Sequence, residues 1–377
     1  MDYKVFESSE GNVWKYVFTK EDMVAEAVLY RYENFYKRTV ICCSTQSGCP
    51  VGCKFCGTGN KFVRNLTAAE IFDQVWTVLK DKNILHTSEK IERFQIMFMS
   101  MGEPMLNWKN VKLAIQQLHD MFPKAELLLS TIAPNSEYYG ELIALSKKIP
   151  QIGLQFSIHR STDSARDLLI PYEDKMALIE IRDLGLLWWK ETGRHPYLNY
   201  CIDGTNTAFQ DAIHLQHLFS PVAFNFTFSV VCSKNENMKN AGYKNLDEIQ
   251  KFEKWFLEAG YNTRIFDPAG QDDIGGGCGQ LWYVQQWMKE YAKEKQMSVN
   301  LKTKCEDCTH KNVCRNRNQA KYFADKLQRT NYGDGPNDDY SYDTMSEHYH
   351  VNIDISCKDY EQVKPVPRTG FPDEIWH

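Results

Sequence analysis

The stretch Cys49-Pro50-Val51-Gly52-Cys53-Lys54-Phe55-Cys56 places three cysteines at the spacing C-x3-C-x2-C, in a loop that glycines flank. Thiolates this close in sequence are expected to converge on one metal centre. Iron–sulfur clusters are held by cysteine thiolates at such spacings, and three thiolates leave one iron of a four-iron cluster without a protein ligand. That open iron is where a cofactor or substrate would bind. A zinc knuckle with a distant fourth ligand is the alternative, although structural zinc takes four closed ligands.

The composition of the whole chain is that of a globular protein. It has 377 residues, of which 43% are hydrophobic and 25% are charged, and its formal net charge is −5. We expect no membrane span, because no apolar run is long enough, and we expect a soluble, cytoplasmic protein. Twelve cysteines in such a chain favour metal binding or thiol chemistry over a disulfide framework. The acidic balance means that contact with a nucleic acid would come from a local basic face.

Outward from the cysteines, short β-rich runs alternate with helical patterns, which is typical of βα units stacked around a parallel sheet. A helix is expected to begin at Thr67, because Thr67 and Glu70 have the spacing of a capping box. The strands are expected at residues 39–43, 94–99, 126–131, 152–158, 197–202, 224–231 and 263–266.

The two ends of the chain have patterns of their own. Residues 1–37 alternate apolar and polar side chains, which predicts an N-terminal β-hairpin extension. We expect the core domain over residues 38–297 and a basic cysteine module with a tail over residues 298–377. Between Lys302 and Arg329 eight basic side chains accompany three acidic ones, and an acidic linker follows.

Further motifs follow the predicted strands, at the edge where parallel strands place their active-site loops. They are Arg64-Asn65-Leu66-Thr67-Ala68-Ala69-Glu70-Ile71, Met101-Gly102-Glu103-Pro104, Ser157-Ile158-His159, Asp203-Gly204-Thr205-Asn206, and Asp272-Asp273-Ile274 leading to Cys278-Gly279-Gln280-Leu281. With the three-cysteine loop, this order resembles the RlmN/Cfr family of radical S-adenosylmethionine (SAM) RNA methyltransferases. The resemblance spans about residues 14–281.

The resemblance implies an α/β fold, a partial (β/α)6 radical SAM barrel with an N-terminal β-hairpin and a C-terminal cysteine-containing extension. It implies a 4Fe-4S cluster on Cys49, Cys53 and Cys56, whose open iron chelates SAM and cleaves it to a 5′-deoxyadenosyl radical. Glu103 would accept the ammonium of SAM. The residues implied to line the cofactor site are Phe55, Gly102, Glu103, Ser130, Ser157, His159 and Asn206. The alternatives to a cofactor-binding role are purely structural: a turn at Glu103 and a helix cap at Asn206.

The family methylates an adenine ring carbon, C2 or C8, in rRNA or tRNA, and this reaction needs two further thiols. The resemblance implies that Cys278 carries the methyl group and that Cys42 resolves the protein–RNA thioether by forming a disulfide. Cys278 lies in a run of glycines, so we expect its thiol to be presented rather than packed. The alternative for Cys42 is a purely structural role as a small, buried apolar residue on a strand. Strand alternation points neighbouring Cys43 to the opposite face.

The sequence departs from the family pattern in several places. Only about 37 residues precede the first barrel strand, so the usual N-terminal accessory domain is expected to be missing. The Asn-Pro pair after the sixth strand is not visible, and Thr207 stands where the family usually has Asp.

The C-terminal module carries a second cysteine set. Cys305, Cys308 and Cys314 suit zinc or a second iron–sulfur cluster, with Cys357 or His310 as a fourth ligand. Three thiols without a metal are the alternative. The basic charge of this module makes it either the RNA contact or simply a solvated face.

Two other functions compete with RNA methylation. One is a radical SAM enzyme that modifies a peptide or small metabolite with the help of an auxiliary cluster, and the other is a non-catalytic, metal-stabilised RNA-binding protein. Neither needs the pair Cys42 and Cys278, so this pair favours the methyltransferase. A flavodoxin or ferredoxin is expected as the electron donor.

Overall fold

The computed structural model describes residues 1–21, 23–58, 61–232, 242–243, 245–268, 274–275 and 277. Contacts divide the chain into Met1–Gln286 and Trp287–His377, and every described residue belongs to the first unit. Cys278, the expected methyl carrier, and the whole C-terminal cysteine module therefore lie outside the described residues.

The chain begins with an antiparallel meander of three strands. These are β1 (Asp2–Glu7), β2 (Val13–Lys20) and β3 (Met23–Tyr32), and β3 pairs antiparallel with β4 (Arg38–Cys42). The predicted hairpin is thus β2–β3, which buries one apolar face in the core. Strand β1 was not expected. Nearly all of it is exposed, so its residues lack the apolar alternation that marks a half-buried strand.

Seven strands of the described chain run parallel and form the centre of the sheet. In spatial order they are β4, β7 (Arg93–Phe98), β8 (Glu126–Thr131), β9 (Ile152–Ser157), β10 (Tyr197–Ile202), β11 (Asn225–Cys232) and β13 (Thr263–Phe266). They coincide with the seven predicted runs, so the predicted α/β class is confirmed. The two-residue β12 (Gly242–Tyr243) pairs antiparallel with β11, and β5 (Gln46–Gly48) pairs with β6 (Phe62–Asn65) in a separate ribbon.

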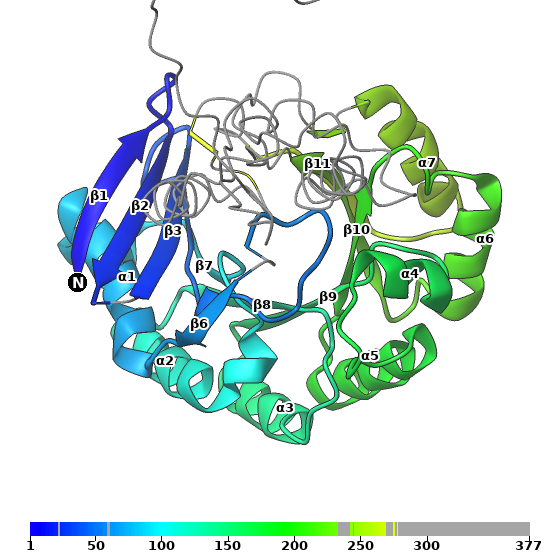
Figure 1. Ribbon diagram of the computed structural model, residues 1–377, viewed down its shortest axis with the longest axis horizontal. Helices are drawn as coiled ribbons and strands as arrows, with labels where there is room; N and C mark the ends of the chain where they lie inside the picture. The colour runs from blue at the N-terminus through cyan, green and yellow to red at the C-terminus, as the bar shows by residue number, and fades with distance from the viewer. Residues whose placement is uncertain are drawn as a thin grey trace, which may run out of the picture. The chain divides into compact units, whose positions relative to one another are not determined.

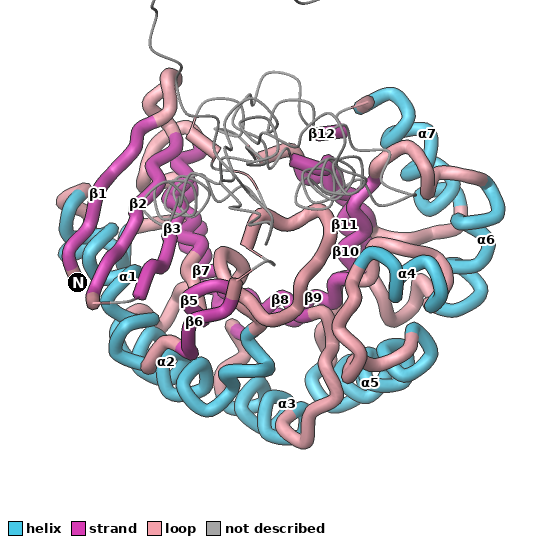
Figure 2. Tube along the Cα trace, viewed as in Figure 1, coloured by secondary structure: helices cyan, strands magenta, loops and turns pink. Residues whose placement is uncertain are grey.

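The helices connect these strands and lie along the outer side of the curved row of strands (Figures 1 and 2). The α-helices are α1 (Ala68–Asp81), α2 (Trp108–Met121), α3 (Tyr139–Lys148), α4 (Asp163–Leu169), α5 (Leu178–Thr192), α6 (Phe209–Leu218) and α7 (Leu246–Glu258), and the 3-10 helices are η1 (Leu85–Lys90) and η2 (Pro104–Asn107). The predicted capping box of α1 is confirmed, because the Glu70 N–H donates to Thr67 Oγ1 and the Thr67 N–H donates to Glu70 Oε2.

The two faces of the sheet bury different sets of side chains. The largest hydrophobic cluster lies between the strands and the helices and includes Ile41, Ile96 and Phe98. A smaller cluster contains Val40 and Cys42 on alternate positions of the same strands. Because successive side chains of a strand point to opposite faces, this second cluster lies on the side away from the helices.

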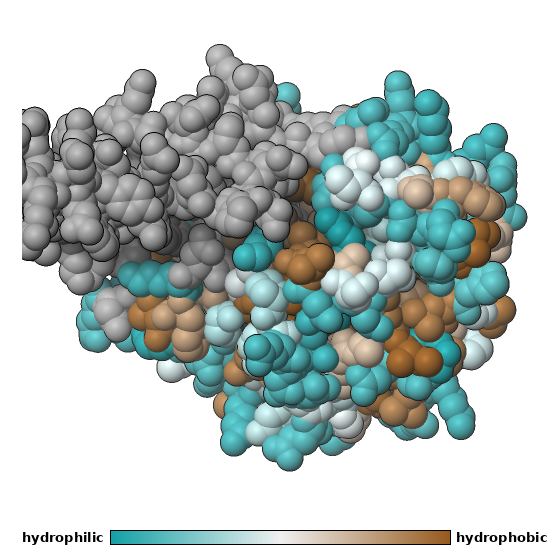
Figure 3. Space-filling view, turned by 45° about the vertical axis from the view of Figure 1, so that its right-hand side comes forward, coloured by the Kyte–Doolittle hydropathy of each residue, from teal (hydrophilic) through white to brown (hydrophobic). Residues whose placement is uncertain are grey.

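The surface of the described residues mixes hydrophilic and hydrophobic groups, as the face drawn in Figure 3 shows. Exposed apolar side chains such as Leu168, Phe209 and Val222 come from different elements, which is normal for a globular surface. Within this part of the chain, no helix has the length and apolar character needed to cross a bilayer.

Candidate active site

The three-cysteine loop, residues 49–58, is held at its start and near its middle by backbone hydrogen bonds. The Cys49 N–H donates to the Lys61 carbonyl at 2.8 Å, and the Lys54 N–H donates to the Leu169 carbonyl at the end of α4 at 2.9 Å. Gly48, just before the loop, has a φ of 78°, and a Cβ there would stand 1.9 Å from the Lys61 oxygen. Only glycine allows this approach, so the loop has a defined entry.

The segment between β4 and the loop is fixed by buried amide side chains. The Ser44 N–H donates to Gln74 Oε1 at 2.9 Å, and Gln74 Nε2 returns a hydrogen bond to the Ser44 carbonyl at 3.0 Å. Asn107 Nδ2 donates to the Thr45 carbonyl at 2.7 Å. These bonds satisfy backbone groups that would otherwise be buried without partners, so residues 44–45, between β4 and β5, are ordered without being part of a strand.

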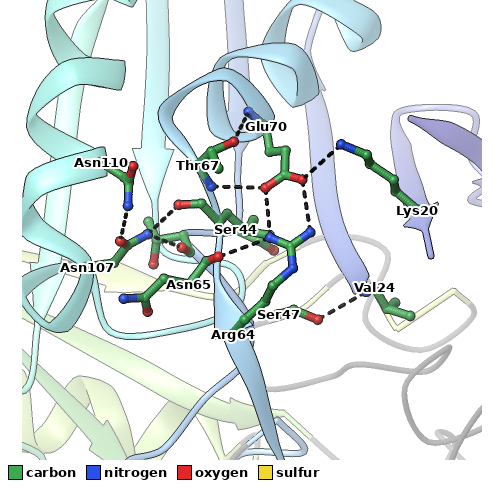
Figure 4. Close-up of polar contacts among 12 residues, drawn as sticks. Lys20, Val24, Ser44, Ser47, Arg64, Asn65, Thr67, Glu70, Asn107 and Asn110 are labelled. Atoms are coloured by element: carbon green, nitrogen blue, oxygen red, sulfur yellow. Dashed lines mark hydrogen bonds and ion pairs between the residues drawn. The ribbon is translucent and has the colours of Figure 1, made fainter. Parts of the chain in front are cut away.

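A polar network beyond the loop joins β6 to α1 (Figure 4). The Arg64 guanidinium donates to both oxygens of Glu70, at 2.9 and 3.0 Å, while Glu70 also closes the cap with Thr67. The bond from Arg64 is the main cause that lowers the pKa of Glu70 to about 2. A bidentate pair of this kind fixes the exit of the loop against the first helix.

The three thiols of the loop influence one another. Each is partly exposed, yet burial by the surrounding protein raises the pKa of Cys49 to about 12 and that of Cys53 well above its ordinary value, and the charge of Cys56 adds to both shifts. Three thiolates at such a place need a cationic centre to hold them charged. Among the described residues, no three Cys, His, Asp or Glu side chains form a ready-made site for a single ion. The donor set fits an iron–sulfur cluster, in which thiolates bind different irons.

Gly102 and Glu103 lie beside this loop. Gly102 has a φ of 98°, and a Cβ there would meet Gln46 at 2.6 Å. Glu103 is buried and accepts hydrogen bonds from Thr131 Oγ1 (2.6 Å), Ile132 N (2.9 Å) and Met105 N. Burial raises its pKa to about 7. A carboxylate has about four acceptor positions, so one remains for the predicted ammonium of SAM.

Two predicted serines meet on the strands opposite. Ser130 Oγ of β8 and Ser157 Oγ of β9 are 3.3 Å apart, and Gln155 Nε2 donates to Ser130 at 3.1 Å. Arg264 of β13 donates to Gln155 Oε1 at 3.2 Å. These side chains share one face of the sheet because they come from alternate positions, and their hydroxyl groups can accept or donate to a polar ligand.

A second group forms around His159. Its ring lies edge-on to Phe55, with the ring centroids 5.0 Å apart, so the end of β9 contacts the cluster loop. Burial lowers the pKa of His159 to about 3, and its Nδ1 accepts from the Cys201 N–H at 3.2 Å. Asn206 Nδ2 donates to the carbonyls of His159 and Cys201. Asn206 therefore holds backbone together here, and its contact with the cofactor stays a prediction.

The cysteines Cys42 and Cys43 lie in different hydrophobic clusters, as strand alternation predicts. Cys43 belongs to the cluster on the helix side, and Cys42 belongs to the smaller cluster on the other face. Ile274 packs against the cluster of Cys42. Lys15 Nζ donates to the Gly275 carbonyl at 3.3 Å. Ile274 and Gly275 therefore lie beside the hydrophobic cluster that contains Cys42.

Sequence reasoning did not single out Thr131, Gln46 or Arg166, which all lie at this site. Thr131 and Gln46 bond the side chain and the N–H of Glu103. Arg166 is buried on α4, and its charge affects the pKa of both Glu103 and His159. No local signal marks these residues, because a Thr, Gln or Arg in a helix or strand is ordinarily interpreted as facing solvent.

Comparison with known proteins gives the family. No family model matches the chain. A protein of Carboxydothermus hydrogenoformans named "Probable dual-specificity RNA methyltransferase RlmN" is 31% identical over 283 residues, which cover 73% of this chain and 77% of that protein. Its namesake from Pseudothermotoga lettingae is 32% identical over 282 residues, covering 73% and 77%.

A solved structure agrees with these relatives. The crystal structure of a radical SAM methyltransferase from Sphaerobacter thermophilus is similar with a TM-score of 0.64 and 26% identity, over 74% of this chain and 80% of that one. Radical SAM chemistry implies a 4Fe-4S cluster and SAM, and the three-cysteine loop has the donors for the cluster. Because the identity extends over most of both chains, this protein belongs to the RlmN family of radical SAM RNA methyltransferases.

Proposed function

We propose that this enzyme methylates a ring carbon of adenine, C2 or C8, in rRNA or tRNA, with Cys278 as the methyl carrier and Cys42 as the resolving thiol. An electron-poor ring carbon does not attack a methyl donor by simple displacement. A radical on a carrier methyl group avoids this difficulty, because a radical adds to such a carbon. The reaction therefore needs one thiol that carries the methyl group and another that releases the product.

The observation that carries this proposal is the position of Ile274 and Gly275. Ile274 packs on the hydrophobic cluster that contains Cys42, and Gly275 is bonded to Lys15. Three further residues of chain extend at most about 10 Å, so the link to Cys278 is short. A carrier and a resolver must meet to form a disulfide, and this proximity supports that pairing.

The remaining site residues support the cofactor role that the family implies. Cys49, Cys53 and Cys56 would hold the cluster, which supplies the electron that cleaves SAM. Ser130, Ser157 and the one free position on Glu103 offer polar partners to SAM. A flavodoxin or ferredoxin would deliver the electron. The cysteines of the C-terminal module would bind zinc or a second cluster.

Release of the product follows from sulfur chemistry. After the methylene radical adds, the adduct would lose one electron, for which the cluster is the acceptor, and Cys42 would take the ring hydrogen as a proton, which leaves a closed-shell thioether. The Cys42 thiolate then attacks the sulfur of Cys278, so an S–S bond forms as the S–CH2 bond breaks. The leaving carbon keeps the electron pair and takes a proton, which completes the methyl group on adenine. The disulfide must then be reduced by two electrons before another turnover.

The test replaces each thiol in the full-length enzyme. Cys42→Ala protein expressed in cells should co-purify with covalently attached RNA that survives denaturation and disappears with nuclease. Cys278→Ala should carry no adduct and should not methylate RNA, whereas wild-type Cys278 should be found partly as S-methylcysteine by mass spectrometry.

Cys43→Ala is the matched control, since Cys43 directly follows the same strand and is buried on the helix side. It should carry no adduct. Normal turnover by Cys42→Ala, or an adduct formed equally by Cys43→Ala, would overturn the two-cysteine mechanism. The sequence of the trapped RNA would identify the substrate.

A further inference from the structure

Arg166 is a fully buried cation on α4 that the mechanism above does not use. Its exposed fraction is 1%. The guanidinium donates to the Met176 carbonyl at 2.8 Å and to the Ile132 carbonyl at 2.5 Å, and its Nε has no hydrogen-bond partner among the described residues. Both known partners are neutral backbone groups, so they do not balance the charge.

No carboxylate of the described residues lies within ion-pair distance of this guanidinium. The nearest acidic groups have other partners: Asp163 accepts from the Leu178 N–H at 2.8 Å, and Asp167 pairs with Lys175 at 2.6 Å. The three donors to Glu103 do not include Arg166. An unpaired buried charge costs several kcal/mol, so a fold keeps one only when something compensates it.

Helix α4, which carries Arg166, lies next to the three-cysteine loop, so the negative charge of a cluster there can compensate the guanidinium. The cluster loop bonds to the end of α4 through Lys54 and Leu169. Cys49 and Cys53 pack against a small cluster that contains Ile132, the residue whose carbonyl Arg166 binds. Burial lowers the pKa of Arg166, whereas Asp163, Asp167 and the Cys53 thiolate favour its charged form. The cysteine loop and the Arg166 guanidinium therefore both contact the small cluster around Ile132.

We infer that Arg166 is the buried counter-charge of the cluster held by Cys49, Cys53 and Cys56, and that it raises the reduction potential of this cluster. The inference rests on the family-implied cluster at this loop and does not depend on the two-cysteine mechanism. Reduction adds one negative charge to the cluster. A fixed cation nearby stabilises the reduced state, because cluster potentials respond to net local charge and to burial.

The test is the midpoint potential of the cluster in anaerobically reconstituted full-length enzyme without RNA, followed by electron paramagnetic resonance. Arg166→Gln keeps a hydrogen-bond donor but removes the charge, so its potential should be more negative than that of the wild type. Arg166→Lys keeps the charge and gives up the paired bonds to two carbonyls. It should have a potential close to the wild type but a lower melting temperature.

Arg194 offers a matched control. It also donates to two backbone carbonyls, those of Pro150 and Ser146, but it lies before β10, at the amino ends of the strands. Arg194→Gln removes a comparable structural interaction far from the cluster. It should lower the melting temperature and leave the potential unchanged.

The outcomes separate the possible failures. An unchanged potential in loaded Arg166→Gln, or an equal shift in Arg194→Gln, would overturn the inference. If Arg166→Gln binds too little iron for a measurement, Arg166→Lys tests the inference instead. A shifted potential in Arg166→Lys, which keeps the positive charge, would contradict a charge effect. Wild-type enzyme without any four-iron cluster would refute the cofactor assignment itself. If the Arg166 and Arg194 variants have the expected potentials but Cys42→Ala carries no RNA adduct, only the proposed two-cysteine mechanism is refuted.

Discussion

His159 shows how one residue joins the cofactor site to the backbone around it. It has a φ of 58°, in the left-handed region that non-glycine residues rarely adopt. Its Nδ1 accepts the Cys201 N–H, so the neutral ring carries its proton on Nε2. That nitrogen is the one left to meet a ligand. Strain held by several bonds at such a place is typical of a functional site.

The buried imidazole predicts a specific dependence of stability on pH. Its pKa is lowered by burial from 6.5 to about 3, so the unfolded chain takes up the proton first as the pH falls. The contribution of His159 is complete above pH 6.5 and is lost as the pH falls toward 3. His159→Gln should remove this part. Urea unfolding of cofactor-free protein at several pH values measures it, and the idea is refuted if wild type and variant lose stability in parallel.

Gly102 leads to a second prediction at this scale. Gly102→Ala puts a Cβ into Gln46 at a positive φ, so it should lower the free energy of unfolding by more than about 1 kcal/mol and weaken SAM binding. Gly140→Ala in α3 is the control, because nothing lies within 4 Å of its Cβ position. It should stabilise the protein by about 0.5–1 kcal/mol. Chemical denaturation measures both, and equal effects would contradict the steric argument.

At this scale the sequence predicted residues whose role lies in a motif and missed those whose role depends on burial. Glu103 and His159 could be singled out as candidates because they follow strands in a recognisable order. Arg166 was not, since a charged residue on a short helix normally faces water, and only tertiary packing shows that this one is buried.

At the scale of elements, the N-terminal hairpin does more than extend the sheet. Lys15 of β2 and Glu26 of β3 form an ion pair at 2.9 Å in which both side chains are 0% exposed. In the register of the two strands they are diagonal neighbours, because Val17 pairs with Glu26. Lys15 also binds the Gly275 carbonyl. Alternation alone assigns both charges to a solvent face, whereas the structure buries them on the face where Ile274 packs.

This pair predicts that stability and catalysis can be separated. Lys15→Met removes one charge of this buried pair and should cost about 3–5 kcal/mol. The double variant Lys15→Met/Glu26→Leu removes both charges and should recover most of that stability. It still lacks the bond to Gly275, so transfer of the methyl group to RNA should remain several-fold slow while SAM cleavage is near normal.

Melting temperatures, single-turnover methylation and 5′-deoxyadenosine formation provide the three readouts. Thr19→Ala, at the far end of β2, is the control for a general change in the hairpin. Recovery of both stability and methyl transfer in the double variant would show that the bond to Gly275 has no part in the reaction.

At the scale of the whole molecule, the parallel sheet was predictable because each strand is a short apolar run followed by a helix pattern. The register and the ribbon β5–β6 were not, since they depend on hydrogen bonds between residues apart in sequence, and β1 was not, since its exposed residues lack apolar alternation. The family match explains why the fold and the cluster loop agree with expectation. For RNA recognition, charge is the only guide that the sequence provides. Because the chain as a whole is acidic, RNA contact is expected at a local basic segment.

The basic segment 302–329 is therefore the place where contact with a polyanion is expected. A protein that neutralises phosphates releases counterions, so its affinity falls with salt in proportion to the number of phosphates it neutralises. Replacing Lys311, Arg315 and Arg317 by Gln should raise the KM for RNA several-fold with little change in kcat. It should reduce the slope of log affinity against log salt by about 2, since each phosphate of a single strand that is no longer neutralised lowers the slope by roughly 0.7.

A matched triple of exposed lysines, Lys80, Lys90 and Lys124, tests whether any removal of positive charge has this effect. These residues lie near the amino ends of the strands, away from the cluster loop, and their replacement by Gln changes the net charge by the same amount. If only long-range attraction matters, both triple variants should change the salt slope equally. If the basic segment binds RNA directly, only its triple variant should change the slope. Equal slopes in both would place the RNA-binding surface elsewhere, most simply on the barrel face around the three-cysteine loop, where Lys54 and Arg64 would be the next residues to replace.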